Sequence, residues 1–329
     1  MMDWTLYILL AAVFVADALL GEPPNALHPV AWFGRLAALT EKLFRKLCGN
    51  GVLSGALAWA CLTLPIPLLF AFLTALAGRR SPWGAFALAA VCCYFCVALR
   101  SLHDHGERIR RPLLQGDLPG ARRALAMIVS RDTEDLSVSE IVRGAVESVG
   151  ENLIDAVTSA WFWVVIGYAV RGLPGAVFGA LFLRTVNTLD ACWGYKNERY
   201  CRFGRVAART DDAVHFIPAR LTLLAIALSA PLVKGCFTET LRIGWRHRHD
   251  HPSPNSGYGM AGFAGALKIR LGGPTVYGGE VENYPFWGDG RKELVPGDLR
   301  RAEILAWASS FVFLLILSGV YLLWRMNFS

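Results

Sequence analysis

Long apolar runs alternate with polar blocks along the chain. Residues 53–77 carry no charged side chain and residues 302–324 carry only Glu303 near one edge, so each run can cross a bilayer as a helix. Slightly shorter apolar runs occupy residues 4–20, 82–99 and 153–170. Polar residues interrupt two weaker candidates, 173–189 and 213–233. The pattern predicts an all-α, polytopic integral membrane protein with about five to seven membrane helices.

The composition supports this prediction. Hydrophobic residues make up 54% of the chain and charged residues only 18%, whereas a water-soluble domain carries about a quarter charged residues. We therefore expect a single membrane-embedded domain over residues 1–329. Residues 4–20 are expected to stay as a membrane helix and not to be cleaved as a signal peptide, because no basic residue precedes them.

Many of the basic residues behind the net charge of +7 gather in two polar segments, 100–152 and 234–301. Such charge can serve nucleic-acid binding, but basic cytoplasmic loops are also what orients membrane helices. We therefore expect both segments to be cytoplasmic and expect no nucleic-acid partner. The first segment should be helical, and the second should be mostly a Gly-, Pro- and Asn-rich loop with short helices. Placing both on one side requires an even number of crossings between them, which 153–170 and one of the two weaker candidates would supply.

An acidic stripe leads into one of the apolar runs. Glu147, Glu151 and Asp155 are spaced four residues apart, so on a helix they share one face. Like charges at this spacing destabilise a helix. Carboxylates that lead into lipid are also costly unless a cation, a substrate or a basic partner compensates them. The structural alternative is an i,i+4 pair between Arg143 and Glu147.

Further polar clusters lie beside the apolar runs. They contain Asp17, Glu22 and His28; Arg131-Asp132-Thr133; Asn187-Thr188-Leu189-Asp190 with Lys196; Arg209-Thr210-Asp211-Asp212 with Arg220; and His251 with Ser253-Pro254-Asn255-Ser256-Gly257. Carboxylate, Asn and Thr oxygens are hard ligands that suit Mg²⁺, which usually joins carboxylates to phosphate oxygens. The chain has no P-loop and no Gly-x-Ser-x-Gly elbow. The spacing of His247, His249 and His251 suits zinc, but in an Arg-rich loop it is more typical of a solvated basic patch.

In order and content these clusters resemble the adenosylcobinamide-phosphate synthase family, integral membrane proteins of late cobalamin (vitamin B12) biosynthesis. The resemblance runs from about residue 13 to residue 280 and ends at Arg270-Leu271-Gly272-Gly273. The chain departs from the family pattern at Glu22, where Asp is usual, at Gly150, where Ala is usual, and at Gly259-Met260, where the family tends to an acidic residue. A membrane protein implicated in β-lactamase regulation is similar in outline but poorer in these motifs.

The resemblance implies an ATP-dependent ligase that forms an amide (C–N) bond. It joins the free propionate of adenosylcobyric acid to aminopropanol phosphate or aminopropanol, giving adenosylcobinamide phosphate or adenosylcobinamide. A carboxylate is a poor acyl donor, and its activation by phosphoryl transfer needs Mg²⁺ and cations around the phosphates. ATP and Mg²⁺ are therefore the expected cofactors. The expected partners are the corrinoid, aminopropanol phosphate, the lipid bilayer and other membrane enzymes of the pathway, and the expected location is the inner cell membrane.

Candidate roles follow from side-chain chemistry within these motifs. The expected metal ligands are Glu147, Glu151, Asp155, Asp190, Asp211 and Asp212. The expected substrate- and phosphate-binding residues are Arg131, Asn152, Asn187, Lys196, Arg209, Arg220, Ser253 and Asn255. The expected catalytic residues are His28, Glu147, Glu151, Asp155 and His251, and either histidine can remove the amine proton.

A different class of function fits the same charges. In a membrane transporter or an ion-coupled channel, intramembrane carboxylates near Arg would be proton or ion sites. Against this class, the polar blocks are long, they carry most of the unusual residues, and no inverted repeat is visible. A membrane sensor or scaffold without catalysis is a third class, and the density of Asp, Asn, Arg and His at the predicted helix ends argues against it.

Overall fold

The computed structural model describes residues 4–24 and 26–328. Within these ranges the chain is built of helices and one two-stranded sheet. The described residues divide into two compact units, which we treat separately: unit 1 takes residues 4–98, 159–215 and 316–328, and unit 2 takes residues 99–158 and 216–315. Helices α10 (Arg205–Ser229) and α13 (Pro296–Phe328) each contribute to both units.

Among the described residues, 5 helices are long and apolar enough to cross a membrane. They are Val52–Arg80, Pro82–Leu114, Val138–Trp193, Arg205–Val233 and Pro296–Asn327. A further apolar helix, α1 (Thr5–Leu20), is shorter. The prediction of an all-α, polytopic membrane protein is therefore confirmed. Its description as a single membrane-embedded domain stays a prediction.

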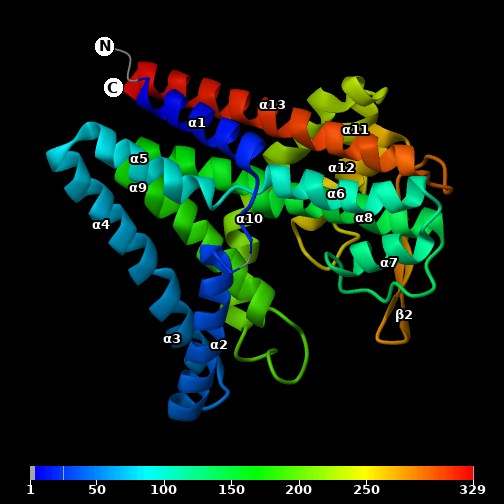
Figure 1. Ribbon diagram of the computed structural model, residues 1–329, viewed down its shortest axis with the longest axis horizontal. Coiled ribbons are helices and arrows are strands. Elements are labelled where there is room, and N and C mark those ends of the chain that lie inside the picture. The colour runs from blue at the N-terminus through cyan, green and yellow to red at the C-terminus, as the bar shows by residue number, and fades with distance from the viewer. Residues whose placement is uncertain (1–3, 25, 329) are drawn as a thin grey trace. The chain divides into compact units, whose positions relative to one another are not determined.

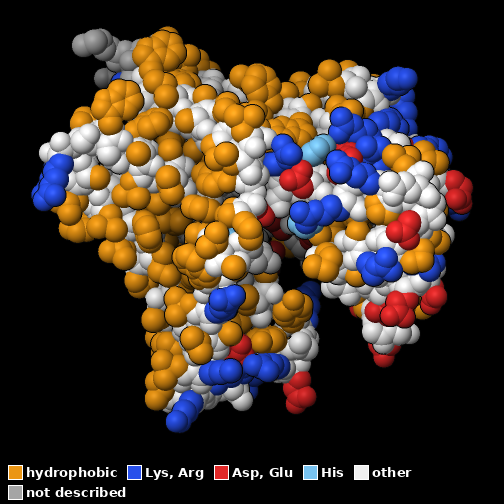
Figure 2. Space-filling model, in the orientation of Figure 1, with side chains coloured by type: hydrophobic (Ala, Val, Ile, Leu, Met, Phe, Trp, Pro, Cys, Tyr) orange, Lys and Arg blue, Asp and Glu red, His pale blue; other side chains and the backbone are white. Residues whose placement is uncertain are grey.

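Unit 1 is a group of apolar helices (Figure 1). It contains α1, α2 (Pro29–Cys48), α3 (Val52–Thr63), α4 (Pro65–Arg80), α5 (Pro82–Tyr94), α9 (Ser159–Trp193) and the adjoining parts of α10 and α13. Large side chains such as Leu68, Phe72 and Trp83 are exposed on this unit. Figure 2 shows hydrophobic side chains over much of the visible face of α3, α4 and α5. A contiguous apolar surface of this kind marks contact with lipid.

Helix α9 reverses direction near Gly172, where φ is +62°, a conformation that glycine adopts without strain. The two arms then approach closely. A Cβ on Gly175 would lie 2.0 Å from the carbonyl oxygen of Gly167, and one on Gly179 would lie 2.1 Å from that of Trp163. The weaker candidate of the sequence, 173–189, is therefore a helix that packs antiparallel to the apolar arm before it.

Unit 2 is mostly helical and carries the sheet. It contains α6 (Leu99–Leu114), α7 (Leu118–Ala126), α8 (Val138–Leu153), the π-helix η1 (Ile154–Thr158), the 3₁₀-helix η2 (Ala230–Val233), α11 (Phe237–Arg246), α12 (Ser256–Leu267), strands β1 (Leu271–Tyr277) and β2 (Glu280–Trp287), and the adjoining parts of α10 and α13. Ser137 and Glu140 form a capping box at the start of α8, as their spacing predicts.

Helix α12 is buried along its whole length and packs against α8 and α11. Gly257, Gly259 and Gly262 have the Gly-x-Gly-x-x-Gly spacing of dinucleotide-binding loops, but here they lie inside a helix that follows another helix, α11. A Cβ on Gly259 would lie 2.2 Å from the carbonyl oxygen of Gly150 on α8. These glycines therefore serve close helix packing.

The segment 234–301 differs from the loop that the sequence predicts. After α11 and α12, strands β1 and β2 form an antiparallel hairpin. Its two-residue turn, Gly278-Gly279, has positive φ at both positions, as a type I′ turn requires. The sequence signal for this hairpin is a Gly-Gly pair between two runs that contain β-branched and aromatic residues.

Candidate functional site

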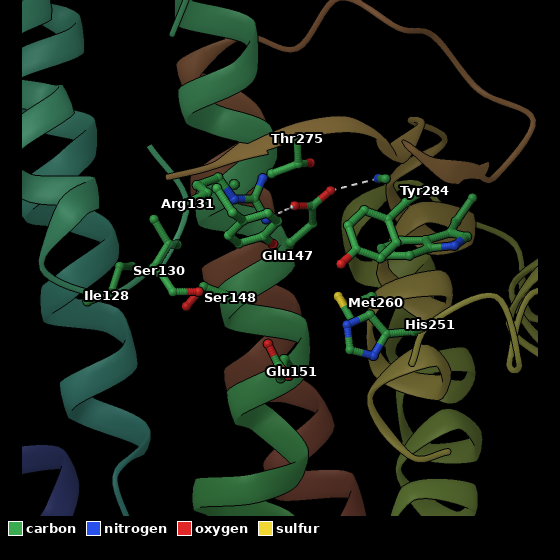
Figure 3. A pocket seen from close by; sticks show the side chains of 15 residues that line it. Ile128, Ser130, Arg131, Glu147, Ser148, Glu151, His251, Met260, Thr275 and Tyr284 are labelled. Carbon is green, nitrogen blue, oxygen red and sulfur yellow. Dashed lines mark hydrogen bonds and ion pairs between the residues drawn. The ribbon is translucent and has the colours of Figure 1, made fainter. Parts of the chain in front are cut away.

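An open pocket with an empty volume of about 640 Å³ lies within unit 2. Its walls come from α8, α12, the hairpin, and the loop that follows α7. The lining residues are Ile128, Val129, Ser130, Arg131, Gly144, Glu147, Ser148, Glu151, His251, Met260, Gly272, Thr275, Tyr277, Tyr284 and Trp287. In Figure 3, Glu147 and Glu151 project from α8, with His251 and Tyr284 across the pocket from them.

Both carboxylate oxygens of Glu147 accept hydrogen bonds. Oε2 accepts a hydrogen bond from Arg131 Nη2 at 2.6 Å, and Oε1 accepts one from the Gly272 backbone N–H at 2.6 Å. The Arg131 side chain is 12% exposed and the Glu147 side chain 5%. Burial alone would lower the pKa of Arg131, but the Glu147 carboxylate outweighs this effect, so the pKa of Arg131 is raised. The guanidinium of Arg131 is therefore held in its charged form and fixed in place beside Glu147.

Two side chains of the pocket carry buried donors with no acceptor among the described residues. Arg131 Nε and Nη1 have no hydrogen-bond partner there, and neither has Trp287 Nε1. Leaving a buried donor unsatisfied costs about 1–3 kcal/mol, and more where the group is charged. Such donors mark the place where an oxygen-rich, anionic ligand group would be bound.

Glu151 lies one helical turn beyond Glu147. Its Oε1 accepts a hydrogen bond from Ser256 Oγ at 3.1 Å, at the start of α12. Unlike Glu147, it forms no ion pair within the described residues. Asn152, a predicted substrate-binding residue, instead donates from Nδ2 to the Ser148 carbonyl oxygen at 2.9 Å.

Asp155 is not among the residues that line the pocket. It lies in the π-helix η1, where the helix is wound by one extra residue per turn. The side-chain hydroxyl of Thr158 donates to the Leu153 carbonyl oxygen at 3.1 Å and lies 2.7 Å from the hydroxyl of Thr222. The extra residue shifts the i,i+4 register, so the straight stripe expected from the sequence ends at Glu151.

Aromatic rings form the wall opposite the carboxylates. Burial raises the pKa of the Tyr277 phenol, and burial together with the Glu282 carboxylate raises that of Tyr284, so both stay protonated near neutral pH. His251 stacks on Tyr284 with ring centroids 6.4 Å apart and planes at 22°. Its Nδ1 accepts from the Ser253 N–H at 3.1 Å, which assigns the proton of the neutral ring to Nε2. His251 thus offers a donor, and a general base would need the other tautomer.

Ser253, Asn255 and Arg220 lie together in unit 2. Arg220 Nη1 donates to Asn255 Oδ1 at 3.2 Å, and the guanidinium lies over the Tyr258 ring, 4.5 Å from its centroid. No carboxylate pairs with Arg220 among the described residues. Ser253 Oγ accepts from the Asn255 N–H at 3.3 Å, which orders the loop before α12.

The remaining candidates lie in unit 1. Asn187 Nδ2 donates to Asp211 Oδ1 at 3.4 Å, and the other oxygen of Asp211 lies 3.2 Å from His215 Nδ1. The other predicted residues of this unit are Asp190, Lys196, Arg209 and Asp212, of which Lys196 and Arg209 are exposed. The structure therefore places half of the expected metal ligands in each unit. No group of three or more His, Cys, Asp or Glu in the described chain has a metal-binding arrangement.

His28 caps the start of α2. Its Nδ1 accepts from the Val30 N–H at 3.2 Å, and its Nε2 lies 3.8 Å from Glu22. Burial lowers the pKa of His28, which Glu22 partly opposes and Arg184 reinforces, so the ring is neutral at pH 7.

Comparison with known proteins decides the family. The family described as CobD/Cbib protein matches residues 9–306. The chain belongs to the CobD/CbiB family. It is 39% identical to the cobalamin biosynthesis protein CobD of Leptospira interrogans, over 94% of this chain and 97% of that protein. It is 36% identical to CobD of Klebsiella pneumoniae (93% and 95% covered) and to CbiB of Salmonella typhimurium (92% and 94% covered). No solved structure matches the chain.

Gly150 and Gly259, two positions where a departure from the family pattern is expected from the sequence, meet at one helix contact. Gly150 on α8 faces Gly259 on α12, and a Cβ on Gly150 would lie 3.3 Å from the Gly259 carbonyl carbon. The next residue, Met260, lines the pocket beside Glu147 and Glu151. An uncharged thioether at this position adds no further negative charge to a pocket that already holds two carboxylates.

Proposed function

We propose that this CobD/CbiB protein is an enzyme of cobalamin biosynthesis that ligates adenosylcobyric acid to aminopropanol phosphate or aminopropanol, with ATP and Mg²⁺. Its curated relatives are named cobalamin biosynthesis proteins. The observation that carries the proposal is the buried Arg131, whose Nε and Nη1 donors have no described partner in a pocket that also holds Glu147 and Glu151. This combination suits the binding of a phosphate group beside carboxylates.

The chemistry joins a carboxylate to an amine. In the proposed sequence a propionate oxygen of the corrinoid attacks the γ-phosphorus of ATP, giving an acyl phosphate and ADP. The amine nitrogen then attacks the acyl carbon, phosphate leaves with the C–O electron pair, and the nitrogen loses one proton. Arg131 would hold phosphate oxygens through these steps with its Nε and Nη1 donors, since hydrogen bonds from a guanidinium to phosphate are charge-assisted and strong.

Glu151 is the carboxylate of the pocket best suited to Mg²⁺. It accepts one hydrogen bond from a neutral hydroxyl, whereas both oxygens of Glu147 are used by Arg131 and Gly272. Mg²⁺ in phosphoryl-transfer sites is usually held by one or two carboxylates plus phosphate oxygens and water, so a set of three protein ligands is not required. Bound there, the ion would neutralise charge on the phosphates.

The test is a reconstituted ligation with the purified full chain in detergent or lipid nanodiscs. Adenosylcobyric acid, aminopropanol phosphate, ATP and Mg²⁺ are supplied together and then with each one omitted. The expected result is a new corrinoid of the amide mass that needs all four. A well-folded protein that makes no such product would overturn the ligase. In proteoliposomes, corrinoid that crosses the membrane unchanged would instead show a transporter.

A further inference from the structure

The β hairpin forms one wall of the pocket. Gly272, Thr275 and Tyr277 of β1 line it, as do Tyr284 and Trp287 of β2. The loop from Ile128 to Arg131, which leads directly into Asp132, also lines the pocket.

Asp132 bonds to the hairpin at three places. Its backbone N–H donates to the Val276 carbonyl oxygen at 2.8 Å. Its carboxylate accepts from the Gly278 N–H at 3.1 Å on Oδ1 and from the Gly279 N–H at 2.7 Å on Oδ2. Both glycines have positive φ, 58° and 82°, and this turn presents two successive amides to one carboxylate.

Among the described residues, the base of the hairpin is packed against its neighbours, with Leu271 and Trp287 buried, whereas its turn end is more exposed. An isolated two-stranded hairpin is marginally stable in water, and six of the eight residues of β2 are exposed. Glu147 holds the base of β1 through the Gly272 N–H, and Arg143 Nη2 donates to the Pro274 carbonyl oxygen at 3.0 Å. Asp132 is the residue that holds the turn.

We propose that Asp132 is a positioning residue. It fixes the hairpin turn against the Arg131 loop, so that Tyr277 stays beside the phosphate-binding guanidinium. The kinetic test of this proposal rests on the ligase function. Whether Asp132 holds the hairpin turn in place can be measured without turnover. Because Asp132 is exposed, its loss should release the turn with little effect on the rest of the fold.

Hydrogen–deuterium exchange of the full chain tests whether Asp132 holds the hairpin turn in place. In Asp132→Ala the peptide amides at the turn end, residues 276–281, should exchange roughly five- to tenfold faster than in the wild type, because two amides lose a charged acceptor. Asp132→Asn keeps an acceptor oxygen and should fall between the two. The matched control is Asp135→Ala, an exposed acid of the same loop, which should leave the hairpin unchanged. Equal exchange in Asp132→Ala and the wild type would overturn the proposal.

Ligation kinetics test the consequence for the substrate. In Asp132→Ala the KM for ATP or aminopropanol phosphate should rise roughly tenfold at a nearly unchanged melting temperature, with partial recovery in Asp132→Asn. A faster-exchanging hairpin with wild-type KM values would show that Asp132 does not shape the site and would overturn the proposal. An inactive wild type would count against the ligase function, and the exchange comparison would still decide whether Asp132 pins the turn.

Discussion

Arg131 and Glu147 form a buried ion pair, 2.6 Å between Nη2 and Oε2, that joins the loop after α7 to the middle of α8. This pair compensates the first carboxylate of the acidic stripe. Arg143, the alternative partner expected from i,i+4 spacing, instead donates to the Pro274 carbonyl oxygen of the hairpin. The structural alternative for the stripe is therefore wrong, and the two carboxylates of the pocket have different environments.

The first prediction concerns Glu147. Glu147→Gln removes the charge that Arg131 neutralises and leaves the guanidinium buried without a counter-ion. Breaking a buried pair in this way costs about 3 kcal/mol or more, so the variant should melt at a clearly lower temperature in detergent and should also lose activity. Glu134→Gln, an exposed neighbour, should melt as the wild type does. An unchanged melting temperature for Glu147→Gln would show that the pair does not stabilise this fold.

The second prediction concerns Glu151. Glu151→Gln is nearly isosteric and breaks no ion pair, and the amide oxygen can still accept from Ser256. We expect wild-type expression, membrane insertion and melting temperature, but no ligation at any tested Mg²⁺ concentration. The comparison with Glu147→Gln separates a chemical role from a structural one. Full activity of Glu151→Gln at limiting Mg²⁺ would remove Glu151 from the metal site.

The sequence predicts the helical membrane architecture because long apolar runs have few alternatives in a bilayer. It also predicts that Arg131, Glu147, Glu151 and His251 share a function, and all four line one pocket. Sequence order cannot show which of these side chains pair with each other, since Arg131 and Glu147 come from different segments. The role of Asp132 depends on the conformation of a glycine turn that lies 146 residues away.

Local irregularities explain other differences between the predictions from the sequence and the structure. The π-helix at Ile154–Thr158 shifts the register, and no residue pattern in that stretch marks it. Polar residues interrupt the apolar run 173–189, but two of them are bonded inside unit 1: Arg184 donates to the Cys96 carbonyl oxygen, and Asn187 donates to Asp211. Polar residues satisfied by tertiary contacts are compatible with a membrane helix.

The third prediction concerns topology. The positive-inside rule places the segments 100–152 and 234–301 in the cytoplasm. This requires that the two arms of α9 cross the membrane and that Arg205–Val233 does not cross it, although its length and composition would permit a crossing. Single cysteines introduced next to Arg111 and Arg291, in a background without exposed native cysteines, should resist a membrane-impermeant maleimide in intact cells and react after lysis. Arg80→Cys, one apolar helix away from the first segment, should react from outside. Labelling of both cytoplasmic positions in intact cells would overturn this orientation.

The last prediction concerns Arg220. Its guanidinium is held by the Asn255 side chain and the Phe216 carbonyl oxygen and lies over the Tyr258 ring, with no described carboxylate as a partner. A cation held in place by neutral groups is suited to bind an anion from the substrate. Arg220→Lys keeps the charge but loses the planar fork, so the KM for ATP or aminopropanol phosphate should rise roughly tenfold with little change in melting temperature. Arg242→Lys is the matched control, because Arg242 is an exposed arginine of the same unit that pairs with Glu239 and Asp289. An Arg220→Lys variant that melts early with unchanged KM values would place Arg220 in the scaffold and leave the Ser253–Gly257 loop without a role in binding phosphate.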